Sequence, residues 1–209
     1  ENRVLADFFA TGTYDARRRL VRTDSPSMDI LVSSNLERYL YEASGGDTDR
    51  VRTALETLAR HRRFDWGELP GAGANPVLAG TATRKEAADA LRRVHAEHGT
   101  LVDPHTAVAL HVLEQYRAGQ LTDGTVPPAR PALVAATASP YKFAPAVLGA
   151  LGGEADPDEF ETLLRLATHA ADERGAPAGL AGLREAEVLH DRVVEVDEVP
   201  ATIEEVLHR

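Results

Sequence analysis

The stretch 25–38 constrains this chain more than any other part of its sequence. It contains a short apolar run, Ile30–Val32, followed by small polar residues that open a predicted helix. Ser34 and Glu37 have the spacing of a capping box, in which a hydroxyl accepts from a first-turn amide and a carboxylate reaches back. An apolar strand that ends in hydroxyls at a helix N-terminus is where α/β proteins hold anions and small ligands. The same pattern also occurs at ordinary capped corners.

Two later corners repeat this pattern. Asp103-Pro104 follows the apolar pair Leu101–Val102, and Ser139-Pro140 follows a second apolar run. Each has a capping residue and then proline at the first helical position. In an open α/β sheet such corners gather at the carboxyl ends of the strands, where ligands bind. The three corners together are a candidate ligand site, although any α/β fold makes several such corners and most of them only cap helices.

Helical periodicity alternates with short β-prone runs along the chain, which favours α/β layers over a helical bundle. The predicted helix 104–116 is apolar on most sides, which indicates a buried helix. The predicted helices are 49–63, 84–98, 104–116 and 157–174. The predicted strands are Ile30–Val32, Val77–Leu78, Leu101–Val102, Leu133–Ala136 and Arg192–Val196. Clusters of glycine and proline predict loops at 69–76, 122–128 and 152–157.

The composition argues against several classes of protein. A net charge of −10 lacks the basic excess of a nucleic-acid-binding protein. No apolar run approaches the roughly 20 residues that a membrane helix needs. Cysteine is absent, which excludes disulfide frameworks and thiolate metal sites and is compatible with a reducing cytoplasm. We therefore expect a globular, cytoplasmic protein with no nucleic-acid partner and no membrane partner.

Several segments carry a family resemblance. Residues 25–38 resemble the SPSMDI-x-VSSN-[FL]-ER signature of the threonine synthase family, in the bacterial and fungal branch of the pyridoxal-phosphate β-family. Residues 101–108 are similar to that family's DPHTAV segment, and residues 136–143 are similar to its STAHPAKF segment, in the same order along the chain. The opening residues 1–14 also resemble a family segment, NDVLTRFFETGDY.

The resemblance implies a fold and an activity. The implied fold class is α/β: the C-terminal part of the large domain of a fold-type II pyridoxal-phosphate enzyme, with short strands flanked by many helices. Residues 1–150 would be the distal part of the catalytic domain, and 151–209 a C-terminal extension packed on it. The implied reaction converts O-phospho-L-homoserine and water into L-threonine and phosphate. Two alternatives stay open: a threonine synthase-like phospho-lyase that makes no threonine, and a non-catalytic α/β module.

The lysines of this chain point to a missing part of the enzyme. In the family, the Schiff-base lysine and the phosphate-binding loop lie upstream of the matched segments. The chain has two lysines. Lys85 is predicted to lie in solvent on a polar-faced helix, and Lys142 matches the lysine of the family-like segment 136–143. It also begins at Glu1 with an amphipathic run and no initiator methionine. We therefore expect a C-terminal piece, inactive alone, whose partner is the missing N-terminal part of the same enzyme.

Thr137 is the strongest cofactor-binding candidate. The resemblance implies that its hydroxyl faces the pyridine nitrogen of pyridoxal phosphate, which a neutral partner leaves unprotonated. The alternative is a β-branched residue that ends a buried strand. Ser139 stands where the commoner family pattern has histidine, so the role of that histidine has no counterpart here, and Ser139 itself either meets substrate or caps its helix.

The first corner supplies further substrate-binding candidates. Ser33, Ser34 and Asn35 belong to the corner itself, and Arg38 can hold a carboxylate or phosphate through its planar fork. Arg38 can equally pair with Glu42 one turn later, which would be a surface contact of little consequence.

The second and third corners supply the remaining candidates. Asp103 is predicted to cap its helix first. His105 lies in the first turn, where the positive helix end disfavours imidazolium. A neutral His105 can donate to a substrate group, or it is a hydrogen-bonded structural histidine. Lys142 is a substrate-binding candidate near Ser139.

Other chemistries find little support in the sequence. His95 and His98 are spaced i, i+3 like a metal pair, but no third ligand is fixed beside them by spacing, so no metal site is expected. No serine lies in a G-x-S-x-G elbow, which argues against an α/β-hydrolase.

Overall fold

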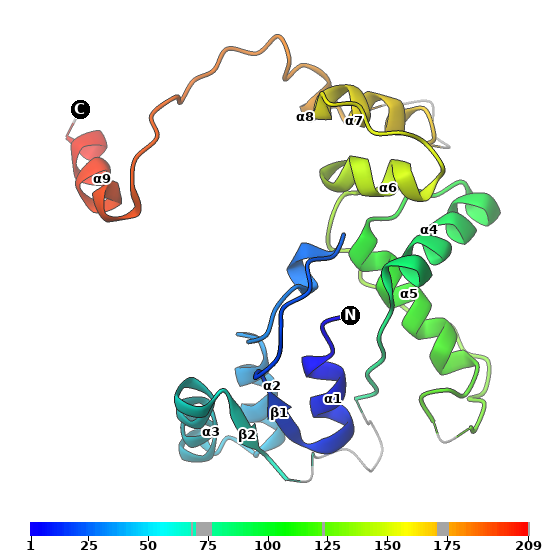
Figure 1. The fold of residues 1–209 in the computed structure, drawn as a ribbon, viewed down its shortest axis with the longest axis vertical. Helices are drawn as coiled ribbons and strands as arrows, with labels where there is room; N and C mark the ends of the chain where they lie inside the picture. Colours follow the sequence, from blue (N-terminus) through cyan, green and yellow to red (C-terminus); the bar gives the residue numbers. More distant parts are fainter. Residues whose placement is uncertain (68, 70–76, 123, 171–175, 209) are drawn as a thin grey trace. The chain divides into compact units, whose positions relative to one another are not determined.

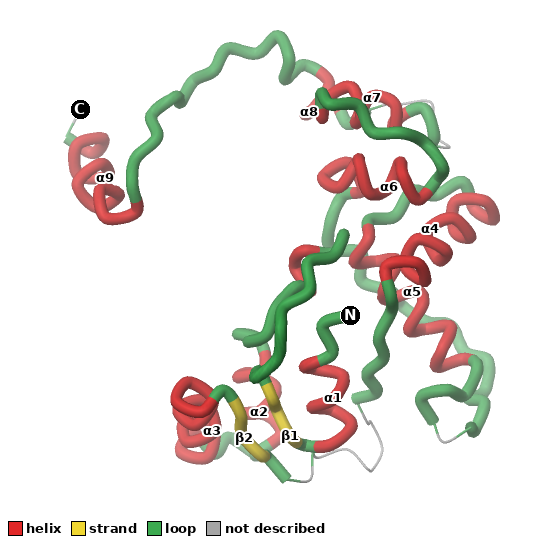
Figure 2. The backbone as a smooth tube through the Cα atoms, in the orientation of Figure 1, coloured by secondary structure: helices red, strands yellow, loops and turns green. Residues whose placement is uncertain are grey.

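The computed structural model describes residues 1–67, 69, 77–122, 124–170 and 176–208. It divides into two units, Glu1–Gly175 and Ala176–Arg209. Helices dominate the described residues, and the only strands among them form one two-stranded sheet (Figure 2). The expected helix-rich α/β class with few short strands is confirmed. None of the described helices is both long enough and apolar enough to cross a membrane.

The first helix, α1, spans Val4–Thr11 because apolar side chains recur at helical spacing. Val4 and Phe8 lie on its buried face. The helix ends at Gly12, which has φ +73° and donates its amide to the Phe8 carbonyl at 2.8 Å. A Cβ atom at Gly12 would lie 2.0 Å from the carbonyl oxygen of Gly67, so only glycine fits this left-handed position.

Two short strands pair into a sheet. The first comes directly after the turn at Gly12, and the second comes after the end of a later helix. β1 (Thr13–Asp15) and β2 (Arg63–Asp65) pair antiparallel, with Tyr14 opposite Phe64. The two rings are stacked with centroids 5.4 Å apart. Such a cross-strand aromatic pair stabilises a sheet that is otherwise too small to stand alone.

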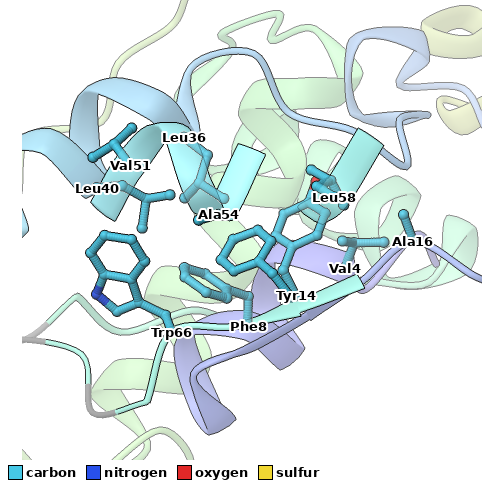
Figure 3. Close-up of a cluster of buried hydrophobic side chains, with 11 residues drawn as sticks. Val4, Phe8, Tyr14, Ala16, Leu36, Leu40, Val51, Ala54, Leu58 and Trp66 are labelled. Carbon is cyan, nitrogen blue, oxygen red and sulfur yellow. The ribbon is translucent and has the colours of Figure 1, made fainter. Parts of the chain in front are cut away.

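Two helices complete a hydrophobic core around this sheet. α2 spans Leu36–Ala43, and α3 spans Thr48–His61 with Asp47 as its cap. Figure 3 shows the side chains of α1, α2 and α3 pointing toward the aromatic rings of the sheet. The cluster contains Val4, Phe8, Tyr14, Ala16, Leu36, Leu40, Val51, Ala54, Leu58, Phe64 and Trp66.

A second group of helices completes the first unit (Figure 1). α4 packs against α5 and α6, and α6 packs against α7 and the short 3₁₀ helix η2. α4 opens with a true capping box, in which Thr83 and Glu86 bond reciprocally. The bounds are α4 Arg84–His98, α5 Pro104–Arg117, η2 Pro140–Phe143, α6 Ala144–Ala150 and α7 Glu159–Ala167.

The second unit is mostly loop. α8 (Ala178–Ala181) and α9 (Val199–Leu207) are joined by irregular chain that ends in the 3₁₀ helix η3 (Val196–Glu198), as Figure 2 shows. An ion pair between Arg192 and Glu205, at 2.6 Å, ties this loop to α9.

The helix predictions are largely confirmed. The predicted helix 84–98 is α4, and those at 49–63 and 104–116 are α3 and α5 with small shifts. α7 covers only part of the predicted helix 157–174, and 171–174 lie outside the described residues. The loops predicted at 122–128 and 152–157 contain no helix or strand where they are described, whereas 70–76 lie outside the described residues.

The strand predictions are wrong, and so is the full burial of α5. None of the five predicted runs forms a strand. Ile30–Val32, Val77–Leu78, Leu101–Val102 and Leu133–Ala136 are irregular, and so is Arg192–Val196 up to Val196, where η3 begins. An extended run becomes a strand only when a neighbouring chain completes its hydrogen bonds, and in the described part only β1 and β2 pair. α5 buries only its first turn, because later side chains such as Val112 line a cavity.

We expect Arg62→Gly to stabilise the chain by about 1 kcal/mol. Arg62 ends α3 in the left-handed region at φ 58°, where a Cβ atom costs free energy. The matched control is Arg60→Gly inside α3, which should destabilise the chain by about 1 kcal/mol. Urea unfolding of both variants measures this difference, and a loss of stability in Arg62→Gly would contradict the assignment.

Candidate functional site

The segment from Thr23 to Asn35 has no strand and one 3₁₀ turn, η1 (Pro26–Met28), so side chains hold its shape. Asp29 accepts hydrogen bonds from the amide of Thr23 at 2.7 Å and from its hydroxyl at 2.8 Å. Asn2 donates to the same carboxylate at 2.9 Å. Asp29 therefore fixes the start of the segment against the beginning of the chain.

Tyr14 fixes the other end of this segment. Its hydroxyl donates to the Leu31 carbonyl at 3.1 Å and accepts from the Ser33 amide at 2.9 Å. The ring is fully buried on β1, and burial raises the pKa of Tyr14 despite the hydrogen bond from Ser33. The phenol therefore stays protonated and serves both as donor and as acceptor.

His105 fixes the middle of the segment from another element. Its Nε2 accepts from the amide of Ser27 at 3.2 Å, and its Nδ1 contacts Asp103 Oδ1 at 2.7 Å. The second oxygen of Asp103 accepts from the hydroxyl of Thr106. His105 and Asp103 are buried, and the imidazole meets the ring of Phe143 edge-on at 4.9 Å between centroids.

A cavity of about 630 Å³ lies beside this segment. Its size suits a small ligand. Its walls come from α1, the segment 23–35, α4 and the residues that precede it, and one face of α5 and α6. Its polar side chains include Asp24, Ser25, Ser27, Asp29, Ser33, Asn35, Thr81 and Thr83. Its apolar side chains include Leu5, Met28, Ile30, Leu91, Val108 and Val112.

The first predicted corner only partly reaches this cavity. Ser33 and Asn35 line it, whereas Ser34 and Arg38 are exposed and do not. The predicted capping box at Ser34 is wrong, because α2 begins after Asn35 and that residue makes no side-chain cap bond. The alternative pairing of Arg38 with Glu42 is also absent: Arg38 donates to Asn35 instead.

The second corner is confirmed as a helix cap. The Asp103 carboxylate accepts from the amide of His105 at 2.9 Å, and Pro104 takes the first helical position and lines the cavity. Both ring nitrogens of His105 have partners within the chain, as in a hydrogen-bonded structural histidine, and its contact with substrate stays a prediction.

The third corner lies away from the cavity lining. Thr137 is exposed on a loop, and the Ser139 hydroxyl caps η2 by accepting from the amide of Tyr141 at 3.3 Å. Lys142 is exposed on η2. None of the three residues lines the cavity, so the described residues do not bring all three corners around one hollow.

The two lysines do not fit a Schiff-base role at the cavity. Lys85 is 84% exposed at its side chain and pairs with Asp89 at 2.7 Å. Neither Lys85 nor Lys142 lines the cavity. For pyridoxal phosphate the chain offers a hydroxyl at Thr137 but no lysine in place, so the residues present do not fit the whole cofactor.

The histidine pair on α4 has other partners. His95 contacts the carbonyl of His169 at 2.8 Å, and His98 lies 3.8 Å from Glu97 on the exposed face. In the part of the chain that the structure describes, no group of three or more His, Cys, Asp or Glu residues is placed to hold a metal ion.

Three residues that hold the site escaped the sequence analysis: Asp29, Tyr14 and Asn2. Asp29 is a carboxylate inside an otherwise apolar run, which is a signal for a buried polar contact. Tyr14 and Asn2 give no local signal, because their partners Ser33 and Asp29 lie 19 and 27 residues away along the chain.

We expect the stability that Asp103 provides to depend on pH. Burial acts to raise the pKa of Asp103, but hydrogen bonds from Thr106 and His105 outweigh it, so that the pKa lies below the ordinary 3.8. A carboxyl with a lowered pKa stabilises the fold above its ordinary pKa and loses this contribution as the pH falls through the folded value. Asp103→Asn should therefore cost about 1–3 kcal/mol near neutral pH, and the gap to wild type should narrow below about pH 4.

Urea unfolding of wild type and Asp103→Asn at several pH values measures this gap. The control is Asp49→Asn, whose side chain is 86% exposed and which should show little gap at any pH. A gap for Asp103→Asn that stays constant with pH would contradict the assignment.

Comparisons with known proteins relate this chain to one family. Residues 106–207 match the family described as "Threonine synthase, C-terminal". The chain is 34% identical over 171 residues to a threonine synthase from Corynebacterium glutamicum, covering 78% of this chain and 34% of that protein. It is 36% identical over 153 residues to threonine synthase-like 1 from Homo sapiens, covering 72% of this chain and 19% of that protein. The chain thus spans about a third or less of these relatives.

Solved structures match over nearly the whole chain. A PLP-bound threonine synthase from Brucella melitensis matches with a TM-score of 0.67 and 30% identity, covering 98% of this chain and 38% of that one. The yeast threonine synthase matches with a TM-score of 0.73 and 25% identity, covering 99% and 40%. The chain therefore corresponds to a C-terminal portion of the proteins of the threonine synthase family.

Proposed function

We propose that the protein to which this chain belongs converts O-phospho-L-homoserine and water into L-threonine and phosphate, with pyridoxal phosphate as cofactor. The observation that carries the proposal is the segment 23–35, called the signature segment because it contains most of the family-like residues 25–38. This segment lines a ligand-sized cavity in a chain related to threonine synthases. The relation to a threonine synthase whose structure contains PLP supports the choice of cofactor.

This chain would supply one wall of the substrate site. Ser33 and Asn35 face the cavity and can donate to a substrate carboxylate or phosphate. Thr137 would meet the pyridine nitrogen of the cofactor. Ser34, Arg38, Ser139 and Lys142, which do not line the cavity of this chain, would approach substrate where the remaining part of the enzyme completes the site. When bound, the cofactor supplies the electron sink for the carbanion.

The partner in this proposal is the rest of the same enzyme. The relatives are much longer than this chain, and neither lysine here is placed at the cavity. We propose that the Schiff-base lysine lies outside these 209 residues, that the chain alone is inactive, and that the enzyme works in the cytoplasm. The division into a catalytic part at 1–150 and an extension at 151–209 stays a prediction.

The test uses the intact protein that contains this chain. Incubated with O-phospho-L-homoserine, it should release threonine and phosphate in equal amounts. Phosphate release without threonine would favour the threonine synthase-like phospho-lyase, and release of neither product would favour a non-catalytic module.

Borohydride reduction of the holoenzyme should fix the cofactor on a lysine outside these residues. Peptide mapping by mass spectrometry locates the adduct. An adduct on Lys85 or Lys142 would contradict the proposed division of the site.

We expect Thr137→Ala to shift the cofactor absorbance and to lower the rate of threonine formation about tenfold, the effect of one lost hydrogen bond. Thr137→Ser keeps the hydroxyl and should resemble wild type. Thr100→Ala, at an exposed threonine after α4, is the control. Unchanged spectrum and rate in Thr137→Ala would refute the contact.

A further inference from the structure

We propose that His105, with Asp103 behind it, is a positioning residue that sets the substrate-facing turn at Ser27. A single imidazole connects three of the four family-like segments. It belongs to residues 101–108, accepts from the amide of Ser27 in 25–38, and packs against Phe143 in 136–143. It is 8% exposed, so it acts from behind the cavity wall and not as a ligand.

The contacts indicate which ring nitrogen carries the proton. A backbone amide can only donate, so Nε2, which faces Ser27, must carry a lone pair. The carboxylate of Asp103 is an acceptor, so Nδ1 must carry the proton. Asp103 is itself fixed by the hydroxyl of Thr106 and the amide of His105. The chain therefore selects one neutral tautomer, as partners of histidine commonly do.

The turn that His105 fixes is part of the cavity wall. Ser27 lies in η1, and Ser25 and Met28, on either side of it, also line the cavity. η1 is a short turn, so the amide of Ser27 depends on His105 for a partner from another element. Losing that acceptor should let the turn shift against the cavity while the helices stay packed.

The two nitrogen contacts can be separated by substitution. His105→Gln puts a carbonyl oxygen near the position of Nε2 and can accept from Ser27, but it loses the donation to Asp103. His105→Asn puts an amide nitrogen near the position of Nδ1 and can donate to Asp103, but it loses the acceptor for Ser27. The control pair is His98→Gln and His98→Asn, at a histidine that is 67% exposed.

The first measurement is hydrogen exchange at the amide of Ser27 in the intact enzyme, resolved by peptide fragmentation and mass spectrometry. We expect exchange about tenfold faster in His105→Asn and close to wild type in His105→Gln, with similar urea unfolding curves for both variants. The proposal would be overturned if the amide of Ser27 exchanged at the same rate in His105→Asn and His105→Gln, whether or not both variants also lost global stability to the same extent.

The second measurement rests on the proposed function. His105→Asn should raise the KM for O-phospho-L-homoserine about tenfold with kcat within about threefold, and His105→Gln should restore KM. An unchanged KM beside the expected exchange pattern would overturn the role at the substrate site. If wild type makes no threonine, the proposed function fails, while the exchange measurement still decides whether His105 positions Ser27.

Discussion

Leu40→Ala is expected to lower the free energy of unfolding of this chain by about 3 kcal/mol. Leu40 is 0% exposed in the core that α1, α2 and α3 form around the small sheet. Removing its side chain leaves a cavity in a core that also contains the rigid rings of Phe8, Tyr14, Phe64 and Trp66, and such a core collapses only partly to fill it. Urea or thermal unfolding measures the loss.

Leu133→Ala is the matched control, because the same atoms are removed from a side chain that is 100% exposed. It should change the free energy of unfolding by less than about 0.5 kcal/mol. A small effect at both positions would contradict the core assignment. Because α2 continues directly from the signature segment, loss of Leu40 should also loosen Ser33 and Asn35.

The helices could be predicted because their determinants are local. The capping pair Thr83 and Glu86 sets the start of α4, and Gly99, at φ +64°, ends it. Asp103 and Pro104 in the same way set the start of α5. Each signal acts within one turn of the chain, so the sequence alone carries it.

The strands and the first corner could not be predicted because their determinants are distant. Ile30–Val32 has strand-like residues, but strand formation depends on a partner that the pattern does not reveal. Helix α2 starts one residue later than the capping box at Ser34 requires. The amide of Ser33 is bonded to Tyr14, 19 residues earlier. The candidate residues were therefore found from the corner pattern and the resemblance, whereas the side chains that hold them in place needed the structure.

We expect Asp29→Ala to lower kcat/KM of the intact enzyme about 100-fold, because a displacement of about 1 Å in a positioning segment can cost that much. The substitution removes the acceptor for the amide and hydroxyl of Thr23 and for Asn2. The signature segment then loses its attachment to the start of the chain. The global stability should fall by only about 1–3 kcal/mol, since the hydrophobic core is untouched.

Asp29→Asn keeps the shape of the side chain at position 29 and removes its charge. Its remaining oxygen can still accept from Asn2 and from the hydroxyl of Thr23, which both bond Oδ1. Its amide group would face the amide of Thr23, where two donors repel each other. We therefore expect an intermediate kcat/KM. Asp49→Ala, at an exposed aspartate on α3, should match wild type. If Asp29→Ala is folded and fully active, the hydrogen bonds of Asp29 do not set the site, and the segment must be held by the rest of the enzyme instead.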